Sequence, residues 1–286
     1  MLKWNDIIDT IREKKISVKV VTMAAALLVL TGLVGIRQSI PTSSTVGDRE
    51  LPIYCVETQE PKIALTFDAA WGNEDTQKIM EILKKHNVKV TFFMTGGWVE
   101  HYPDDVKMIL AEGHDLGNHS ENHKNMSQLA DSEKETELMK VHEKVKNLTG
   151  YEMFLFRPPY GDYDNAVVKT AKKCGYYTIQ WDVDSLDWKD YGVDSIIKTV
   201  TEHKHLGNGS IILCHNGAKY TAQALDTLIT TLQDKGYTFV PLSQLIYRDN
   251  YTKGDRFQTI DSKNGHLQTS AHFMINHIIF DGILID

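Results

Sequence analysis

The sequence contains little cysteine and no excess of basic residues. Its 3 cysteines among 286 residues are widely spaced and form no CxxC pair, which argues against a disulfide framework. We expect Cys174 and Cys214 to be buried as small hydrophobic residues. The net charge is −7, so nucleic-acid binding has no electrostatic support. These absences favour an ordinary globular protein.

Charge is also missing from residues 20–36, a run rich in alanine, leucine and valine that follows a basic segment. Its length is at the lower limit for a membrane-spanning helix, and the preceding positive charge predicts that residues 1–19 stay in the cytoplasm. Since no clear A-x-A cleavage site follows the run, we expect an uncleaved signal anchor and a single-pass protein of the cell membrane. A cleaved signal peptide of a secreted protein and a buried core helix are the alternatives.

Residues 37–60 contain proline, serine, threonine and glycine and are expected to form a tether. With an anchor or a signal peptide before it, the chain from residue 61 onward lies outside the cytoplasm. Residues 248–286 match no pattern that we can assign, and we give this tail no role.

From residue 62 onward, short apolar runs alternate with helical patterns. Strands are predicted at 63–67, 88–94, just before 118, and at 154–156, 176–181, 210–214 and 237–240, and helices at 73–87, 104–112, 131–149, 165–174, 193–205, 221–235 and near 242. This alternation in roughly seven units is typical of an α/β protein with a parallel sheet, either open or closed into a barrel.

Polar side chains follow the predicted strands at the same end. They are Asp68, His119 and His123, Arg157, the three aspartates 182, 184 and 187, and His215. Because active sites of βα folds gather at the carboxyl ends of the strands, we expect these side chains to lie close together.

Two histidines, His119 and His123, are four residues apart, a spacing that places both on one face of a helix. Two imidazoles on one face can bind a single metal ion such as zinc. A pair that stands alone is more often solvated helix surface.

Two further groups suit proton transfer. Asp68 ends a buried strand, where a carboxylate is costly unless it is paired; Arg157 is a candidate partner, in a structural ion pair or around a general base. His215 ends another apolar strand. It is either a core histidine or an acid whose imidazolium is favoured by Asp187.

The segment 157–161 reads Arg-Pro-Pro-Tyr-Gly, a rigid turn that can present a backbone N–H to an oxyanion or be an ordinary turn. Trp188 and Trp71 can stack on a sugar face or belong to the core.

Five segments together resemble the motifs of the polysaccharide deacetylase family, carbohydrate esterase family four, over about residues 62–245. In family order, T-F-D-D-G appears as Thr66-Phe67-Asp68-Ala69-Ala70, H-S/T-x-x-H as His119-Ser120-Glu121-Asn122-His123, R-x-P-Y as residues 157–160, D-x-x-D-W as 184–188 and L-x-H as 213–215. Residues 69–74 resemble the sporulation branch, whose members are membrane-anchored or secreted proteins of spore-forming bacteria.

This resemblance implies a distorted (β/α) barrel of about seven parallel strands over residues 61–247, preceded by the membrane anchor helix. It also implies metal-assisted de-N-acetylation of a sugar. Asp68 would be the general base, oriented by Arg157. His215 would be the general acid, tuned by Asp187, and Tyr160 would supply the oxyanion N–H.

The implied partners are an N-acetylated glycan, most simply peptidoglycan of the cell wall, and the membrane through residues 20–36. Trp188 and Leu213 would line the acetyl pocket. Nucleic acid is not expected as a partner, and the sequence leaves the oligomeric state open.

The implied cofactor is a divalent metal, zinc in the first place with cobalt or another ion as alternatives, held by His119 and His123. The family's third ligand is an aspartate, and here Ala69 stands in its position. Glu74 or Asp75 could replace it, a water could complete the shell, or the metal could bind weakly.

Two other functions remain open. One is a glycan-binding protein, weakly active or inactive, on a deacetylase scaffold. The other is a hydrolase of a different acyl amide or ester, which would use the same residues.

Overall fold

The computed structural model describes residues 49–249, 251–253 and 257–260. The chain divides into two compact units, 1–49 and 50–286, and nearly all described residues belong to the second. The predicted cytoplasmic segment 1–19, the membrane segment 20–36 and residues 37–48 of the tether lie outside the described residues. Within the described ranges, no helix is both long and apolar enough to cross a membrane.

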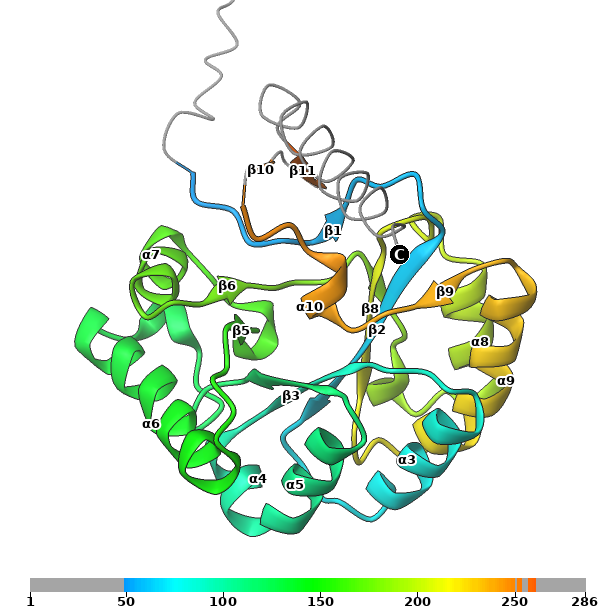
Figure 1. Ribbon diagram of the computed structural model, residues 1–286, viewed down its shortest axis with the longest axis horizontal. Helices are drawn as coiled ribbons and strands as arrows, with labels where there is room; N and C mark the ends of the chain where they lie inside the picture. Colours follow the sequence, from blue (N-terminus) through cyan, green and yellow to red (C-terminus); the bar gives the residue numbers. More distant parts are fainter. Residues whose placement is uncertain (1–48, 250, 254–256, 261–286) are drawn as a thin grey trace, which may run out of the picture. The chain divides into compact units, whose positions relative to one another are not determined.

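The second unit is built around an eight-stranded parallel sheet with the spatial order β6-β5-β4-β3-β2-β8-β7, in which β9 also pairs with β2 (Figure 1). The strands are β2 (Lys62–Ala69), β3 (Thr91–Met94), β4 (Asp115–Asn118), β5 (Leu155–Phe156), β6 (Tyr177–Thr178), β7 (Val183–Asp184), β8 (Ile211–His215) and β9 (Thr238–Phe239). The sheet curls, but among the described residues no pairing joins β6 to β7. The expected parallel α/β architecture is confirmed as a distorted, open barrel.

Helices form an arc around the outer side of this sheet (Figure 1). They are α3 (Thr76–Lys85), α4 (Gly96–His101), α5 (Pro103–Ala111), α6 (Asp131–Thr149), α7 (Asn165–Lys173), α8 (Val193–Thr201) and α9 (Thr221–Asp234). The short α10 (Leu242–Leu245) lies inside this arc (Figure 1). Helix α6 spans the predicted residues because both of its ends are signalled locally. The Glu133 carboxylate accepts from the backbone N–H of Ala130, and Gly150 ends the helix at φ 77°.

Strand β2 is buried on both faces, as expected for a central parallel strand. Ile63, Leu65 and Phe67 belong to the larger apolar cluster, together with residues of the helices. Ala64 belongs to a second apolar cluster on the other side. Because side chains alternate along a strand, Asp68 shares the face of Ala64, and it lies one residue before the strand ends.

A small second sheet was not anticipated from the sequence. It contains β1 (Cys55–Val56), β11 (Phe257–Ile260) and β10 (Tyr251–Lys253) in that order, with β1 parallel to β11 and β10 antiparallel to it. Leu51, Ile53 and Val56 are buried, so part of the predicted tether 37–60 is packed against the domain. The pairing joins segments about 200 residues apart, which no local pattern reveals.

Candidate active site

Asp68 and Arg157 form a buried ion pair at the carboxyl ends of β2 and β5. The Arg157 Nη1 donates to Asp68 Oδ1 at 2.7 Å, and Arg157 is fully buried. Its guanidinium also lies 4.2 Å from the centroid of the Phe93 ring. Burial alone would raise the pKa of Asp68, but the Arg157 charge, the smaller effects of His119 and His215 and the Arg157 hydrogen bond together outweigh it and leave that pKa below 3.8. Asp68 is therefore an ionised carboxylate held in one orientation.

His215 lies directly beside this carboxylate, because it ends β8 and is the ladder partner of Asp68. Its Nδ1 lies 2.7 Å from Oδ1 of Asp187. Oδ2 of Asp187 accepts from the His215 backbone N–H and from the Thr221 hydroxyl. Burial lowers the pKa of His215, yet the Asp187 hydrogen bond and charge more than compensate and raise it above 6.5. With Nδ1 bound to Asp187, Nε2 is the nitrogen left to exchange a proton with a ligand.

Asp187→Asn is expected to lower the pKa of His215, because the amide removes the negative charge that favours the imidazolium. A proton NMR titration of the His215 ring measures this change. The charged His215–Asp187 pair stabilises the fold fully below pH 6.5. This contribution is lost as the pH rises through the raised pKa of His215. The exposed Asp234→Asn is the control, and an equal His215 pKa in wild type and Asp187→Asn would contradict this account.

His119 and His123 come together in a loop, not on a helix, so the helical interpretation of their spacing was wrong. The loop follows β4, and Ser120 and His123 adopt φ values of 66° and 53°, which a helix cannot contain. The two imidazole centroids are nevertheless 4.9 Å apart. His119 Nδ1 lies 2.7 Å from the Arg157 carbonyl oxygen, which leaves Nε2 as the available ligand atom.

The protonation of His119 suits a ligand. Burial lowers its pKa to about 4, so the ring is neutral at pH 7. Its Nε2 lies 3.5 Å from Asp68 Oδ2. The imidazole nitrogen is therefore held beside the ionised carboxylate.

Two residues that sequence reasoning missed hold this loop. Asn118 accepts from the Ser120 backbone N–H and donates to Leu138 O. Glu137, on α6, accepts from both the backbone and side-chain N–H groups of Asn122. Asn118 could have been found from the sequence, because it directly precedes the histidine motif. Glu137 could not, because it is one of many charged residues in its helix.

The metal site implied by the resemblance is incomplete. Ala69 ends β2, is fully buried and belongs to the larger apolar cluster. Across the described ranges, no group of three His, Cys, Asp or Glu side chains is arranged to hold a metal ion. Two imidazoles alone do not form the three-ligand set of a catalytic zinc site. The residues present therefore do not fit that site, although His119 and His123 can supply two ligands.

The suggested substitutes for the missing ligand lie elsewhere. Glu74 is exposed. Asp75 Oδ1 accepts from the Gly217 backbone N–H at 2.9 Å, while its Oδ2 is buried without a hydrogen-bond partner among the described residues. Burial raises the pKa of Asp75 to about 6. Asp75 therefore ties the start of α3 to the loop after His215, an arrangement that the sequence did not reveal.

Aromatic side chains border the paired groups. Trp71 stacks on the His215 ring at 5.2 Å and is 48% exposed, and Trp188 is 49% exposed, so neither is a core residue. Tyr160 has a φ of 59°, and its ring lies 4.6 Å from that of His123. Leu213 is buried within β8. The arrangement therefore offers a base, an acid and exposed aromatic faces of the kind that stack on sugars.

Comparison with known proteins agrees with this geometry. The sequence profile of the family "Polysaccharide deacetylase" matches residues 56–179. Peptidoglycan-N-acetylmuramic acid deacetylase PdaA of Bacillus subtilis is 37% identical over 202 residues, which cover 68% of this chain and 74% of PdaA. The uncharacterized protein YlxY of the same species is 37% identical, over 68% of this chain and only 60% of YlxY.

Solved structures give the same fold. A Bacillus anthracis protein described as a CE4 family pseudoenzyme shares 37% identity and a TM-score of 0.65, over 68% of each chain. A mutant of that protein, described as having restored enzymatic activity, shares 38% identity at the same TM-score, over 68% of this chain and 71% of that one. The resemblance inferred from the five motifs, and with it the class of deacetylase hydrolases, is thereby confirmed: the chain belongs to the polysaccharide deacetylase family.

Proposed function

We propose that this protein binds an N-acetylated glycan of the cell wall, peptidoglycan in the first place, and removes its acetyl group by hydrolysis. The observation that carries this proposal is the pairing of Asp68 with His215 on neighbouring strands, each held by a buried partner of opposite charge. The name of the relative PdaA supports peptidoglycan as the substrate class.

The described residues suffice for the proton transfers of amide hydrolysis. Asp68, ionised beside Arg157, accepts a proton from the attacking water. The His215 imidazolium, stabilised by Asp187, donates a proton to the departing amine. Trp71 and Trp188 present exposed faces on which sugar rings can stack. Because the third metal ligand is absent, the site is poorly equipped to stabilise the oxyanion. We therefore expect slow turnover.

Acetate release from peptidoglycan and from N-acetylated oligosaccharides tests this function, with and without added zinc or cobalt. We expect slow release by the wild type and none by Asp68→Asn, in which the base is replaced by an isosteric amide. Absence of release from wild type under every metal condition would refute the enzyme.

A second candidate is glycan binding without turnover, and two observations favour it. Ala69 stands at the position of the third metal ligand, and the similar Bacillus anthracis structure is described as a pseudoenzyme. Binding of peptidoglycan fragments that equals that of an active relative, without acetate release, would establish this candidate in place of the enzyme.

We also propose that residues 20–36 anchor the protein in the cell membrane, with residues 61–247 outside the cytoplasm and a secreted form as the alternative. The charge-free run after a basic segment supports the anchor. The similarity of residues 69–74 to the sporulation branch supports a role in spore formation. Zinc is the first metal to test at His119 and His123.

A further inference from the structure

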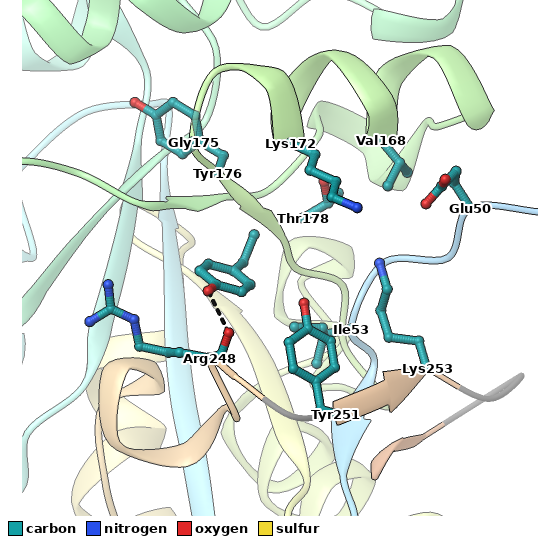
Figure 2. Close-up of a pocket in the computed structure, with 11 residues that line it drawn as sticks. Glu50, Ile53, Val168, Lys172, Gly175, Tyr176, Thr178, Arg248, Tyr251 and Lys253 are labelled. Atoms are coloured by element: carbon teal, nitrogen blue, oxygen red, sulfur yellow. Dashed lines mark hydrogen bonds between the residues drawn. The ribbon is translucent and has the colours of Figure 1, made fainter. Parts of the chain in front are cut away.

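A cavity of about 340 Å³ lies away from the paired catalytic groups, where α7 and β6 meet the small second sheet. Its lining includes Lys172 of α7, Thr178 of β6, and Tyr251 and Lys253 of β10 (Figure 2). The volume is within the range of small-molecule sites, at the size of one or two sugar units. None of the residues assigned to the deacetylase site lines it.

Hydrogen-bond donors converge on this cavity from opposite sides. Figure 2 shows Lys172, above, and Lys253, below, directing their amino groups toward one another across the opening, with the Tyr251 hydroxyl on the same side as Lys253. Unlike the neighbouring Lys173, which pairs with Glu135 at 3.0 Å, neither lysine has an ion-pair partner among the described residues. The two ammonium groups repel each other, and the Glu50 carboxylate on the same lining offsets this repulsion at Lys253. An anion bound between the two lysines would attract both of them.

A buried hydroxyl provides an independent observation. Thr178 is only 5% exposed, and its Oγ1 is buried without a hydrogen-bond partner among the described residues. An unsatisfied buried hydroxyl is costly, and this one belongs to a residue of the cavity wall. This oxygen has less than 1 Å² of solvent-accessible area, so a bound acceptor would satisfy it once a neighbouring side chain of the cavity wall moves aside.

The charged residues that line the cavity are mostly positive. Lys172, Lys253 and Arg248 face a single acidic residue, Glu50, in a chain whose net charge is −7. Arg248 lies at the edge, with its guanidinium 4.5 Å from the centre of the Phe154 ring. Burial lowers the pKa of Lys253, the Glu50 charge raises it by a smaller amount, and the Lys172 charge lowers it by less than Glu50 raises it. A bound anion would act in the same direction as Glu50 and favour the charged form of Lys253.

The aromatic part of the lining suits a ring-shaped ligand. The rings of Tyr177 and Tyr251 lie 6.4 Å apart at an angle of 46°, and the Tyr177 hydroxyl donates to the Arg248 carbonyl oxygen. Tyrosine faces stack on the apolar faces of sugars while their hydroxyls remain hydrogen-bonded.

We propose that this cavity is a second carbohydrate-binding site, which takes a sugar unit bearing a phosphate or a carboxylate. Lys172 and Lys253 would bind the anionic group, Thr178 would donate to it, and the tyrosines would contact the ring. Such a site would hold an anionic polysaccharide against a surface of the protein other than the deacetylase site.

Calorimetric titration of the full-length protein tests the site with glucosamine phosphate, glucuronate, neutral glucose and inorganic phosphate. We expect one or both charged sugars to bind at least about 10-fold tighter than glucose and inorganic phosphate, and binding to weaken with added salt. Preference between the two charged sugars identifies phosphate or carboxylate as the natural group.

Variants connect the binding to the cavity. Lys172→Met and Lys253→Met should each weaken charged-sugar binding about 10-fold, and the nearly isosteric Thr178→Val about 5-fold. Lys173→Met, on the same helix but outside the cavity, is the matched control and should bind as the wild type does. Circular dichroism melting of each variant separates a lost contact from a lost fold.

Several results would overturn the proposal. If glucose binds as tightly as the charged sugars, the anionic group does not contribute to binding. If inorganic phosphate binds as tightly as glucosamine phosphate, the sugar ring does not contribute. An equal loss of affinity in Lys173→Met and Lys172→Met would place the binding outside this cavity.

Discussion

Replacing Ala69 with aspartate should raise acetate release from peptidoglycan by at least about 10- to 100-fold in the presence of zinc. Loss of a partner that only hydrogen-bonds a metal ligand already lowers metal affinity or activity about 10- to 100-fold. A residue that binds the metal directly should contribute at least as much. The new carboxylate would join His119 and His123 and complete a three-ligand set. Acetate release and the metal content of the purified protein are the two measurements, and they should rise together.

The stability of Ala69→Asp should depend on metal, which the activity alone would not show. Ala69 is fully buried among apolar residues, so a carboxylate there is costly unless a cation pairs with it. We expect a lower melting temperature than wild type in the presence of a chelator and a larger rise on addition of zinc. Ala70→Asp, one residue beyond β2, is the matched control. If Ala69→Asp gains neither metal nor activity, the missing aspartate is not what limits this site.

Arg157→Met should lower the free energy of unfolding by about 3–5 kcal/mol, as expected when one partner of a buried ion pair is removed. The pair is closed at 2.7 Å, with Arg157 at 0% and Asp68 at 5% exposure. Denaturant unfolding at pH 7 measures the loss. Lys146→Met, which breaks the solvent-exposed pair with Glu152, is the control and should change stability little.

The pH dependence of Arg157→Met separates the charge from packing. In the wild type, the pKa of Asp68 lies below 3.8, so its stabilising contribution is present above that pH and is lost as the pH falls through the lowered pKa. In the variant, burial is opposed only by the smaller effects of His119 and His215, and Asp68 should titrate above 3.8. The stability difference from wild type should therefore shrink toward low pH. A difference that is constant from pH 7 to pH 3 would show that only the packing of the guanidinium on Phe93 was lost.

Local signals in the sequence were enough for most of the fold. Helix α6 lies at the predicted residues because a capping glutamate and a terminal glycine act within a few positions of its ends. Helix α4 was missed because its six residues are too few for a periodic pattern. Strand β1 was missed because it is stabilised by a partner about 200 residues away.

The sequence by itself determined the family, the order of the five motifs, the absence of the third ligand at Ala69 and the candidate acid and base. These are properties of residue identity and of spacing along single segments. Only the tertiary structure decided that His119 and His123 meet through a loop with two left-handed residues, that Asp75 does not replace the missing ligand, and that Lys172 and Lys253 face each other across a cavity. Those features depend on backbone conformation and on contacts between distant segments, which a local pattern of residues does not contain.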